Sequence, residues 1–198
     1  MAFYEELKKQ RWDDHRLYHH SRVNQTLHLI SALTFLVSYV MCFVNAAAAA
    51  FLGWIIAMWL RQVGHFFFEP KTFDEVNQLD HDEKEAIKVG YNLRRKVVLL
   101  VLWAATPLVL LYDPAAFGLI GDPQASTFWA SLGLLWLVLG IAAVLFRTLQ
   151  LFFIADVQTG CVWFTKILTD PFHDLKMYYR APLKLLQGER LDPMNHVT

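Results

Sequence analysis

The sequence predicts an all-α fold, a polytopic membrane helical bundle with four transmembrane helices. Hydrophobic residues make up 56% of the 198 residues, charged residues only 18%, and the mean hydropathy is +0.31. A soluble domain usually has about 25% charged residues, so this composition favours an integral membrane protein. The apolar residues also gather into runs close to the roughly 20 residues that cross the hydrocarbon core. We therefore predict one membrane domain over residues 1–198, with transmembrane helices at 26–45, 51–68, 97–111 and 128–146.

The N-terminal segment, residues 1–20, is predicted to be an amphipathic helix that lies along the membrane surface. Its apolar side chains, Phe3, Leu7, Trp12 and Leu17, are separated by charged residues. The segment has no short apolar core followed by a small-residue cleavage site, so we expect that no signal peptide is removed. This helix would bring the histidines that follow it to the membrane interface.

The first two transmembrane helices are predicted to form a hairpin. Ser21 is a plausible N-cap before the first of them. The connection at 46–50 consists of alanines, carries no charge and is expected to be a tight turn. The second helix is interrupted only near its end, by Arg61, Gln62 and His65. Ionisable residues inside a membrane segment are costly, so these positions are candidates for function.

The remainder of the chain is predicted to alternate between the cytoplasm and the membrane. The 69–96 segment is polar and is expected to form a cytoplasmic loop that is partly helical. The 149–168 segment is apolar but contains several polar residues, and it could be a fifth transmembrane helix. That would place the basic residues after it outside, so we favour a fourth helix that continues into the cytoplasm or bends along the surface. Pro171 would then begin a last short helix, and 147–198 is predicted to be cytoplasmic or interfacial.

The distribution of basic residues predicts the orientation of the chain. Lysine and arginine are frequent in the N-terminal arm, the 69–96 loop and the C-terminal tail, and absent from the connections at 46–50 and 113–127. The positive-inside rule therefore places both termini in the cytoplasm, with the protein in a bacterial inner membrane or the endoplasmic reticulum membrane. The formal net charge is zero, so nothing in the global charge indicates a nucleic-acid partner.

Seven of the eight histidines fall on or near the predicted cytoplasmic face, and only His196 lies in the tail. Random placement would have scattered some of them to the other side. Imidazoles gathered at a membrane boundary, with a carboxylate nearby, are typical of a metal or cofactor site. The predicted metal ligands are His19, His20, His28, His65, Glu69 and His173.

Helix geometry limits which of these side chains can share one ion. His65 and Glu69 are four residues apart and lie on one helical face. His20 and His28 would be about 12 Å apart along an unbroken helix, which is too far for one ion. Either the helix breaks near Ser21, or there are two ions. In addition, His15, His19 and His20 form a His-x-x-x-His-His pattern that can bind a metal unaided if the segment is helical.

At these residues the chain resembles the 2-hydroxy fatty acid dioxygenase family, formerly a domain of unknown function. The resemblance covers roughly residues 15–70 and rests on Tyr18, His19, His20, Asn24 and His28, followed by Gly64, His65, Phe68 and Glu69. Ser21-Arg22 stands where a proline often follows the paired histidines of the family. The resemblance implies a membrane-embedded, iron-dependent enzyme that uses O2 to remove one carbon from a 2-hydroxy fatty acid. The fungal member acts in phytosphingosine breakdown at the endoplasmic reticulum.

With this activity, the expected cofactor is Fe2+, as one or two ions, and the expected partners are O2, the bilayer and a membrane lipid or fatty acid. Iron held by neutral imidazoles with open coordination positions suits a 2-hydroxy carboxylate, which offers two oxygen ligands. The acyl tail would lie in the apolar bundle, with Arg61, Arg94 or Arg95 paired to the carboxylate. Asn24 is also predicted to contribute to substrate binding.

Three other classes of function remain open from the sequence. His28 and His65 at similar depth on neighbouring helices could clamp a haem, as in a membrane electron carrier. The His15-x-x-x-His19-His20 pattern is also found in di-iron lipid hydroxylases and desaturases, which need about eight clustered histidines. The protein could instead be a non-catalytic membrane partner.

Overall fold

The computed structural model describes residues 2–69, 72–74, 77–91, 93–120 and 127–194, so His196 lies outside the described part. All regular secondary structure in the described residues is helical, apart from isolated bridges between single residues. The elements are α1 (Phe3–Tyr18), α2 (Arg22–Met41), α3 (Ala46–Phe51), η1 (Leu52–Met58), α4 (Trp59–Val63), η2 (Gly64–Phe68), α5 (His81–Ile87), α6 (Leu93–Tyr112), α7 (Phe128–Ile154), α8 (Val157–Tyr178) and α9 (Ala181–Leu186). The predicted all-α fold class is confirmed.

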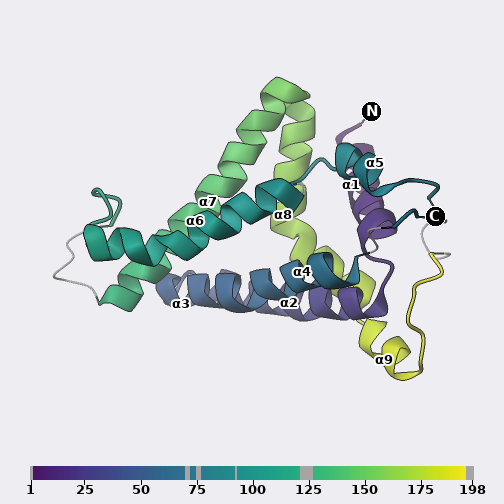
Figure 1. Ribbon diagram of the computed structural model, residues 1–198, viewed down its shortest axis with the longest axis horizontal. Helices are drawn as coiled ribbons and strands as arrows, with labels where there is room; N and C mark the ends of the chain where they lie inside the picture. Colours follow the sequence, from purple (N-terminus) through teal and green to yellow (C-terminus); the bar gives the residue numbers. More distant parts are fainter. Residues whose placement is uncertain (1, 70–71, 75–76, 92, 121–126, 195–198) are drawn as a thin grey trace.

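The helical hairpin at the base of Figure 1 consists of α2 and the continuous helix α3–η2. Asn45 is the N-cap of α3, and its side chain accepts a hydrogen bond of 3.0 Å from the Ala48 amide. The alanines at 46–50 are therefore helical rather than part of the turn, in keeping with the high helix propensity of alanine. The connection lies at residues 42–45, between the end of α2 and this cap.

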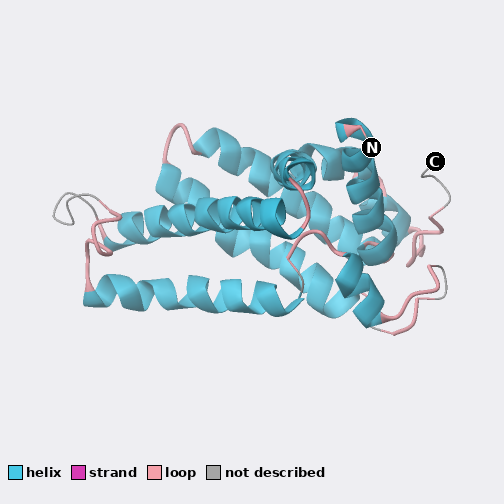
Figure 2. Cartoon of the chain, turned by 90° about the horizontal axis from the view of Figure 1, so that it is seen from above, coloured by secondary structure: helices cyan, strands magenta, loops and turns pink. Residues whose placement is uncertain are grey.

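Helices α7 and α8 form the inverted V above the hairpin in Figure 1, and α6 runs diagonally against α7. The fourth predicted transmembrane helix extends to Ile154, where the chain bends before Asp156 caps α8. Helix α8 packs against α1, α2 and α7, and it does not have the apolar character of a membrane span. Pro171 was expected to begin a new helix, but it lies inside α8. Seen from above in Figure 2, the helices lie together in one packed group.

Four helices in the described residues are long and apolar enough to cross a membrane: Arg22–Met41, Ala46–Phe68, Arg94–Tyr112 and Phe128–Ile154. Only 11% of the apolar window of α6 is buried inside the molecule, and Val98, Val101 and Leu108 on that helix are each more than half exposed. A helix with this much exposed apolar surface requires a bilayer rather than water as its solvent. The helices thus suggest an integral membrane protein, as expected from the composition.

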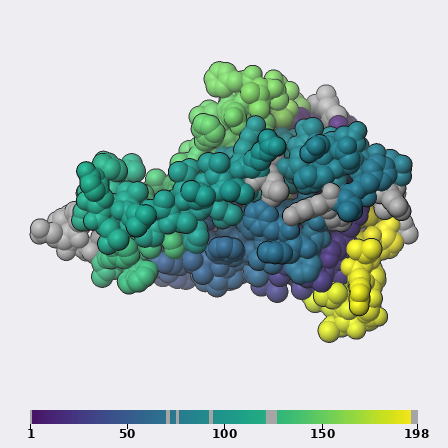
Figure 3. Space-filling model, viewed as in Figure 1, coloured from purple at the N-terminus to yellow at the C-terminus, as the bar shows by residue number. Residues whose placement is uncertain are grey.

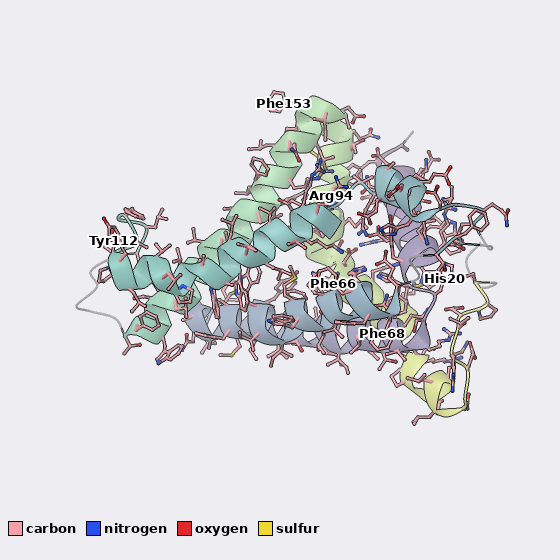
Figure 4. All side chains as sticks on the ribbon, in the orientation of Figure 1. His20, Phe66, Phe68, Arg94, Tyr112 and Phe153 are labelled. Atoms are coloured by element: carbon pink, nitrogen blue, oxygen red, sulfur yellow. The ribbon has the colours of Figure 1, made fainter. Side chains whose placement is uncertain are left out.

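Aromatic side chains hold the bundle together on the side of Tyr112, opposite to His20 in Figure 4. The Trp54 indole donates a hydrogen bond of 2.8 Å to the Trp136 carbonyl, and the Trp136 indole donates one of 2.6 Å to Thr106 Oγ1. These bonds satisfy the polar edges of otherwise apolar rings. At the other end, α8 packs against α1 and α2, and η2 packs against α2.

Candidate metal centre

Three histidines converge where α1 ends and α2 begins. His19 follows the last residue of α1, His28 lies two turns into α2, and His65 lies in the π-helical stretch η2. Their ring centroids are 4.1 Å apart for His19 and His28, 5.1 Å for His28 and His65, and 5.5 Å for His19 and His65. One ligand nitrogen from each ring lies within 4.8 Å of the other two. A buried cluster with this spacing can hold a metal ion.

The helix break that permits this convergence falls at residues 19–21. The C-terminal segment secures it, because the Asp192 amide donates a hydrogen bond of 2.7 Å to the His20 carbonyl. The Gln25 side-chain amide bridges the His19 carbonyl at 2.8 Å and Asp192 Oδ2 at 2.7 Å. Arg22 donates to the same carboxylate oxygen at 2.6 Å. The backbone around His19 is thus fixed by partners from the opposite end of the chain.

Each of the three imidazoles has its Nδ1 atom beside an oxygen atom. Tyr178 Oη lies 2.8 Å from His19 Nδ1, and Asp174 Oδ2 lies 3.5 Å from His28 Nδ1. His65 Nδ1 lies 2.6 Å from Glu69 Oε2. In metal sites the second ring nitrogen of a ligating histidine almost always contacts a carboxylate, a carbonyl or water, which fixes the tautomer and the ring orientation. His19 and His65 are therefore oriented as ligating histidines usually are, whereas His28 Nδ1 lies near Asp174 but makes no hydrogen bond with any described residue.

The remaining nitrogens fit a metal. His19 Nε2 and His28 Nε2 are buried, and neither has a hydrogen-bond partner in the described residues. Burial, followed by the nearby His28 and His15, holds the pKa of His19 well below its usual range, so the ring is neutral and has a lone pair to give. Buried ring nitrogens without a partner are costly, and a metal ion would compensate this cost.

A cavity of about 170 Å³ lies beside the histidine cluster. Its apolar wall includes Met58, Leu99, Trp163 and Ile167, and its polar wall carries several acidic and basic groups. Side chains from α1, α2, α4, α6 and α8 contribute to this lining. The cavity can thus accept a molecule with an apolar part and a charged head.

Gly64 is required because η2 packs closely against α2 at this position. A Cβ atom at this position would lie 2.0 Å from Asn24 Oδ1 and 3.7 Å from a carbon of the His28 ring. Asn24 is fully buried, and its side-chain amide donates a hydrogen bond of 2.8 Å to the Tyr18 carbonyl. Asn24 therefore holds the end of α1 against α2, beside the histidine cluster.

Replacing Gly64 by alanine is expected to destabilise the protein by about 1–3 kcal/mol, because the new methyl group overpacks the Asn24 side chain. The displaced amide would also shift the end of α1 and weaken metal binding. Thermal unfolding and metal titration in detergent measure both effects. Gly53→Ala is the matched control, since its Cβ would meet Phe35 at an ordinary 3.7 Å. Equal behaviour of the two variants would contradict this role for Gly64.

Three of the predicted ligands lie outside the cluster of ring nitrogens. His20 Nε2 contacts the Arg16 carbonyl and lies 3.8 Å from Asp74 Oδ2, and Figure 4 shows the residue at the end of the molecule. Glu69 supports His65 rather than joining the three rings, and burial raises the pKa of its carboxyl to about 7. His173 lines the cavity, where burial lowers its pKa to about 4. The ring that approaches His28 is thus His19, not its neighbour.

The predicted substrate-binding arginines differ in their surroundings. Arg61 lines the cavity but is ion-paired with Asp174. Arg94 and Arg95 are exposed at the beginning of α6, and Figure 4 shows Arg94 there. The residue that follows them, Lys96, lines the cavity instead.

Sequence reasoning did not identify Asp174 and Tyr178, the α8 residues that contact His28 and His19. They are four residues apart, so they lie on the same face of α8. Tyr178 Oη also lies 3.0 Å from His15 Nδ1, and burial, with the nearby Asp174, raises the pKa of this phenol well above its usual value. The Asp-x-x-x-Tyr spacing predicts that the two side chains share one face of a helix. It does not predict which residues that face contacts.

Comparison with known proteins bears on the segment that carries all three clustered histidines. Residues 6–79 match the family model described as Mpo1-like, 2-hydroxy-palmitic acid dioxygenase Mpo1-like. No curated protein and no solved structure matches the chain. Residues 6–79, less than half of the chain, are therefore similar to the Mpo1-like 2-hydroxy-palmitic acid dioxygenase family.

Proposed function

We propose that this protein is an iron(II)-dependent membrane dioxygenase that shortens a 2-hydroxy fatty acid by one carbon. The supporting observation is the buried cluster of His19, His28 and His65, whose ligand nitrogens lie within 4.8 Å of one another beside a cavity. All three residues lie inside the segment that matches the dioxygenase family. The overall reaction balances with one O2 per 2-hydroxy acid and yields the acid one carbon shorter, carbon dioxide and water.

In this proposal the three imidazoles hold the ion, and the residues behind them keep the rings in place. When bound, iron(II) supplies Lewis acidity toward the 2-hydroxy carboxylate and redox chemistry toward O2. Tyr178 and Glu69 contact the Nδ1 atoms of His19 and His65, and Asp174 lies 3.5 Å from the Nδ1 atom of His28. The Arg61 guanidinium balances Asp174, which lets this carboxylate stay ionised while buried.

The geometry favours this proposal over the haem and di-iron alternatives. A haem clamped between His28 and His65 needs a gap for the macrocycle, but His19 packs against both rings. The di-iron lipid hydroxylases and desaturases need about eight clustered histidines, and the cluster in the described residues has three. A mononuclear iron site is the alternative in which all three rings serve as ligands.

We further propose that the site opens at the cytoplasmic face of a bacterial inner membrane or the endoplasmic reticulum membrane. The first and last helices, α1 and α9, lie at the same end of the molecule in Figure 1, and α9 protrudes there in Figure 3. The basic residues of the chain outside the apolar helices are concentrated in the N-terminal arm, the 69–96 loop and the C-terminal segment after residue 154. The enzyme would thus take its substrate from the bilayer and keep the acid head group near the cytoplasm.

Anaerobic loading of the purified protein with Fe(II) tests this function. After O2 is admitted, we expect 2-hydroxypalmitate to disappear, with equimolar oxygen uptake and formation of the C15 acid. The metal-free protein is the control. Iron-loaded protein that consumes neither O2 nor the 2-hydroxy acid would contradict the proposal, as would a protein that takes up no iron.

A further inference from the structure

We propose that Lys96 is the binding site for the carboxylate of an acyl substrate. This inference rests on the proposed function, which it extends by naming the residue that recognises the acid head group. The reasoning begins with the charges around the cavity. Five basic side chains line it in the described residues: Arg11, Arg61, Lys88, Lys96 and Lys166.

Four of these five cations already have partners. Arg61 pairs with Asp174, and Lys166 pairs with Asp14 and, at 2.8 Å, with Asp170. Arg11 donates to the Thr169 hydroxyl at 2.7 Å and lies 3.8 Å from Asp170. These three cations are thus neutralised by acids of α1 and α8.

Lys88 is also engaged, because its ammonium lies 3.5 Å from Glu85 Oε1 and 3.4 Å from the centre of the Tyr18 ring. Lys96, in contrast, makes no hydrogen bond or ion pair with any described residue. Two acids, Glu69 and Asp14, interact electrostatically with Lys96. Glu69 contacts His65 instead, and Asp14 forms an ion pair with Lys166. Lys96 is therefore the cation of this cavity that lacks its own counter-ion.

An ammonium group in a partly buried cavity is stabilised when an anion enters beside it. The same cavity is lined by His19, His28 and His65, so an anion at Lys96 lies in the compartment of the proposed metal. Leu99 follows one turn later on α6 and also lines the cavity, as do Met58 and Ile167. A carboxylate at Lys96 would thus have its hydrocarbon chain against an apolar wall.

This arrangement predicts selectivity for acids over uncharged lipids of the same length. A neutral amide or alcohol would leave the Lys96 ammonium without an anion, whereas a free fatty acid would neutralise it. Lys96 lies outside the segment matched to the family, so the inference concerns a residue that the family match does not cover.

The test compares Lys96→Met and Lys96→Arg with Lys176→Met, which removes an exposed charge from α8. Metal-free proteins in neutral phosphatidylcholine nanodiscs are titrated with radiolabelled 2-hydroxypalmitate and with its uncharged amide. We expect Lys96→Met to bind the acid about 30-fold more weakly or worse, with little change for the amide. Lys96→Arg and Lys176→Met should bind the acid nearly as the wild type does.

Three outcomes would overturn the inference: unchanged acid binding by Lys96→Met, equal weakening for acid and amide, or a parallel loss of iron binding. Lys96→Gln provides the same comparison if the methionine variant does not fold. In iron-loaded protein, Lys96→Met should raise KM for the acid more than it lowers kcat. The proposed function fails separately if the wild type binds the acid but no iron.

Discussion

Replacement of His28 by alanine is expected to abolish iron binding and activity while leaving the protein folded. His28 is 1% exposed, and its Nε2 atom has no partner in the described residues. In the proposed site a metal ion satisfies this nitrogen, and the alanine variant lacks that ligand. We expect iron to fall from about one ion per chain to background, because two imidazoles from His19 and His65 are too few to retain it. Metal analysis after anaerobic loading measures this loss.

His81→Ala is the matched control for this variant. His81 is the first residue of α5 and is not among the residues that line the cavity. It should retain iron and turnover at the wild-type level. If His28→Ala bound iron as well as His81→Ala does, the proposed ligand set would be wrong. Unchanged turnover in His28→Ala would favour a protein whose activity does not depend on this site.

Replacement of Asp174 by alanine is expected to produce the largest loss of stability. The substitution leaves the Arg61 guanidinium, only 16% exposed, without its counter-ion, and it removes the oxygen beside His28 Nδ1. Breaking a buried ion pair from one side costs about 3–5 kcal/mol, and loss of an outer partner of a ligand lowers metal affinity about 10–100-fold. Chemical denaturation and iron titration measure these two effects.

The double variant Asp174→Ala/Arg61→Met separates the two roles of Asp174. Removal of both charges should restore much of the lost stability, because no unpaired guanidinium remains. Metal affinity should stay low, because His28 still lacks its oxygen partner. Recovery of both properties together would mean that Asp174 acts only through Arg61.

The fold was predictable from composition and apolar run lengths, because a bilayer imposes its thickness on any helix that crosses it. A helix break near Ser21 was one of the alternatives that the sequence left open, since one ion cannot bridge His20 and His28 on a straight helix. The structure has this break. The sequence could not decide which of His19 and His20 joins the cluster with His28. Adjacent residues on a helix differ by about 100° in direction, and where α1 ends decides which ring faces α2.

The same one-residue ambiguity explains the other differences in the site. The sequence pointed to His173 and to Arg94 and Arg95, whereas the structure places Asp174 beside His28 and Lys96 in the cavity. Asp174 directly follows His173 in the chain, and Lys96 directly follows Arg95. The partners on α8 lie about 150 residues from the histidines, so only the packing of α8 against α2 selects the face.

The most direct test of the metal centre is X-ray absorption at the iron K edge of protein loaded anaerobically with Fe(II). We predict a first shell that contains three imidazole nitrogens, seen by their characteristic ring scattering, and an iron edge that falls to background in His65→Ala. A first shell of oxygen alone, or a spectrum that His65→Ala leaves unchanged, would contradict the convergence of His19, His28 and His65 on one ion.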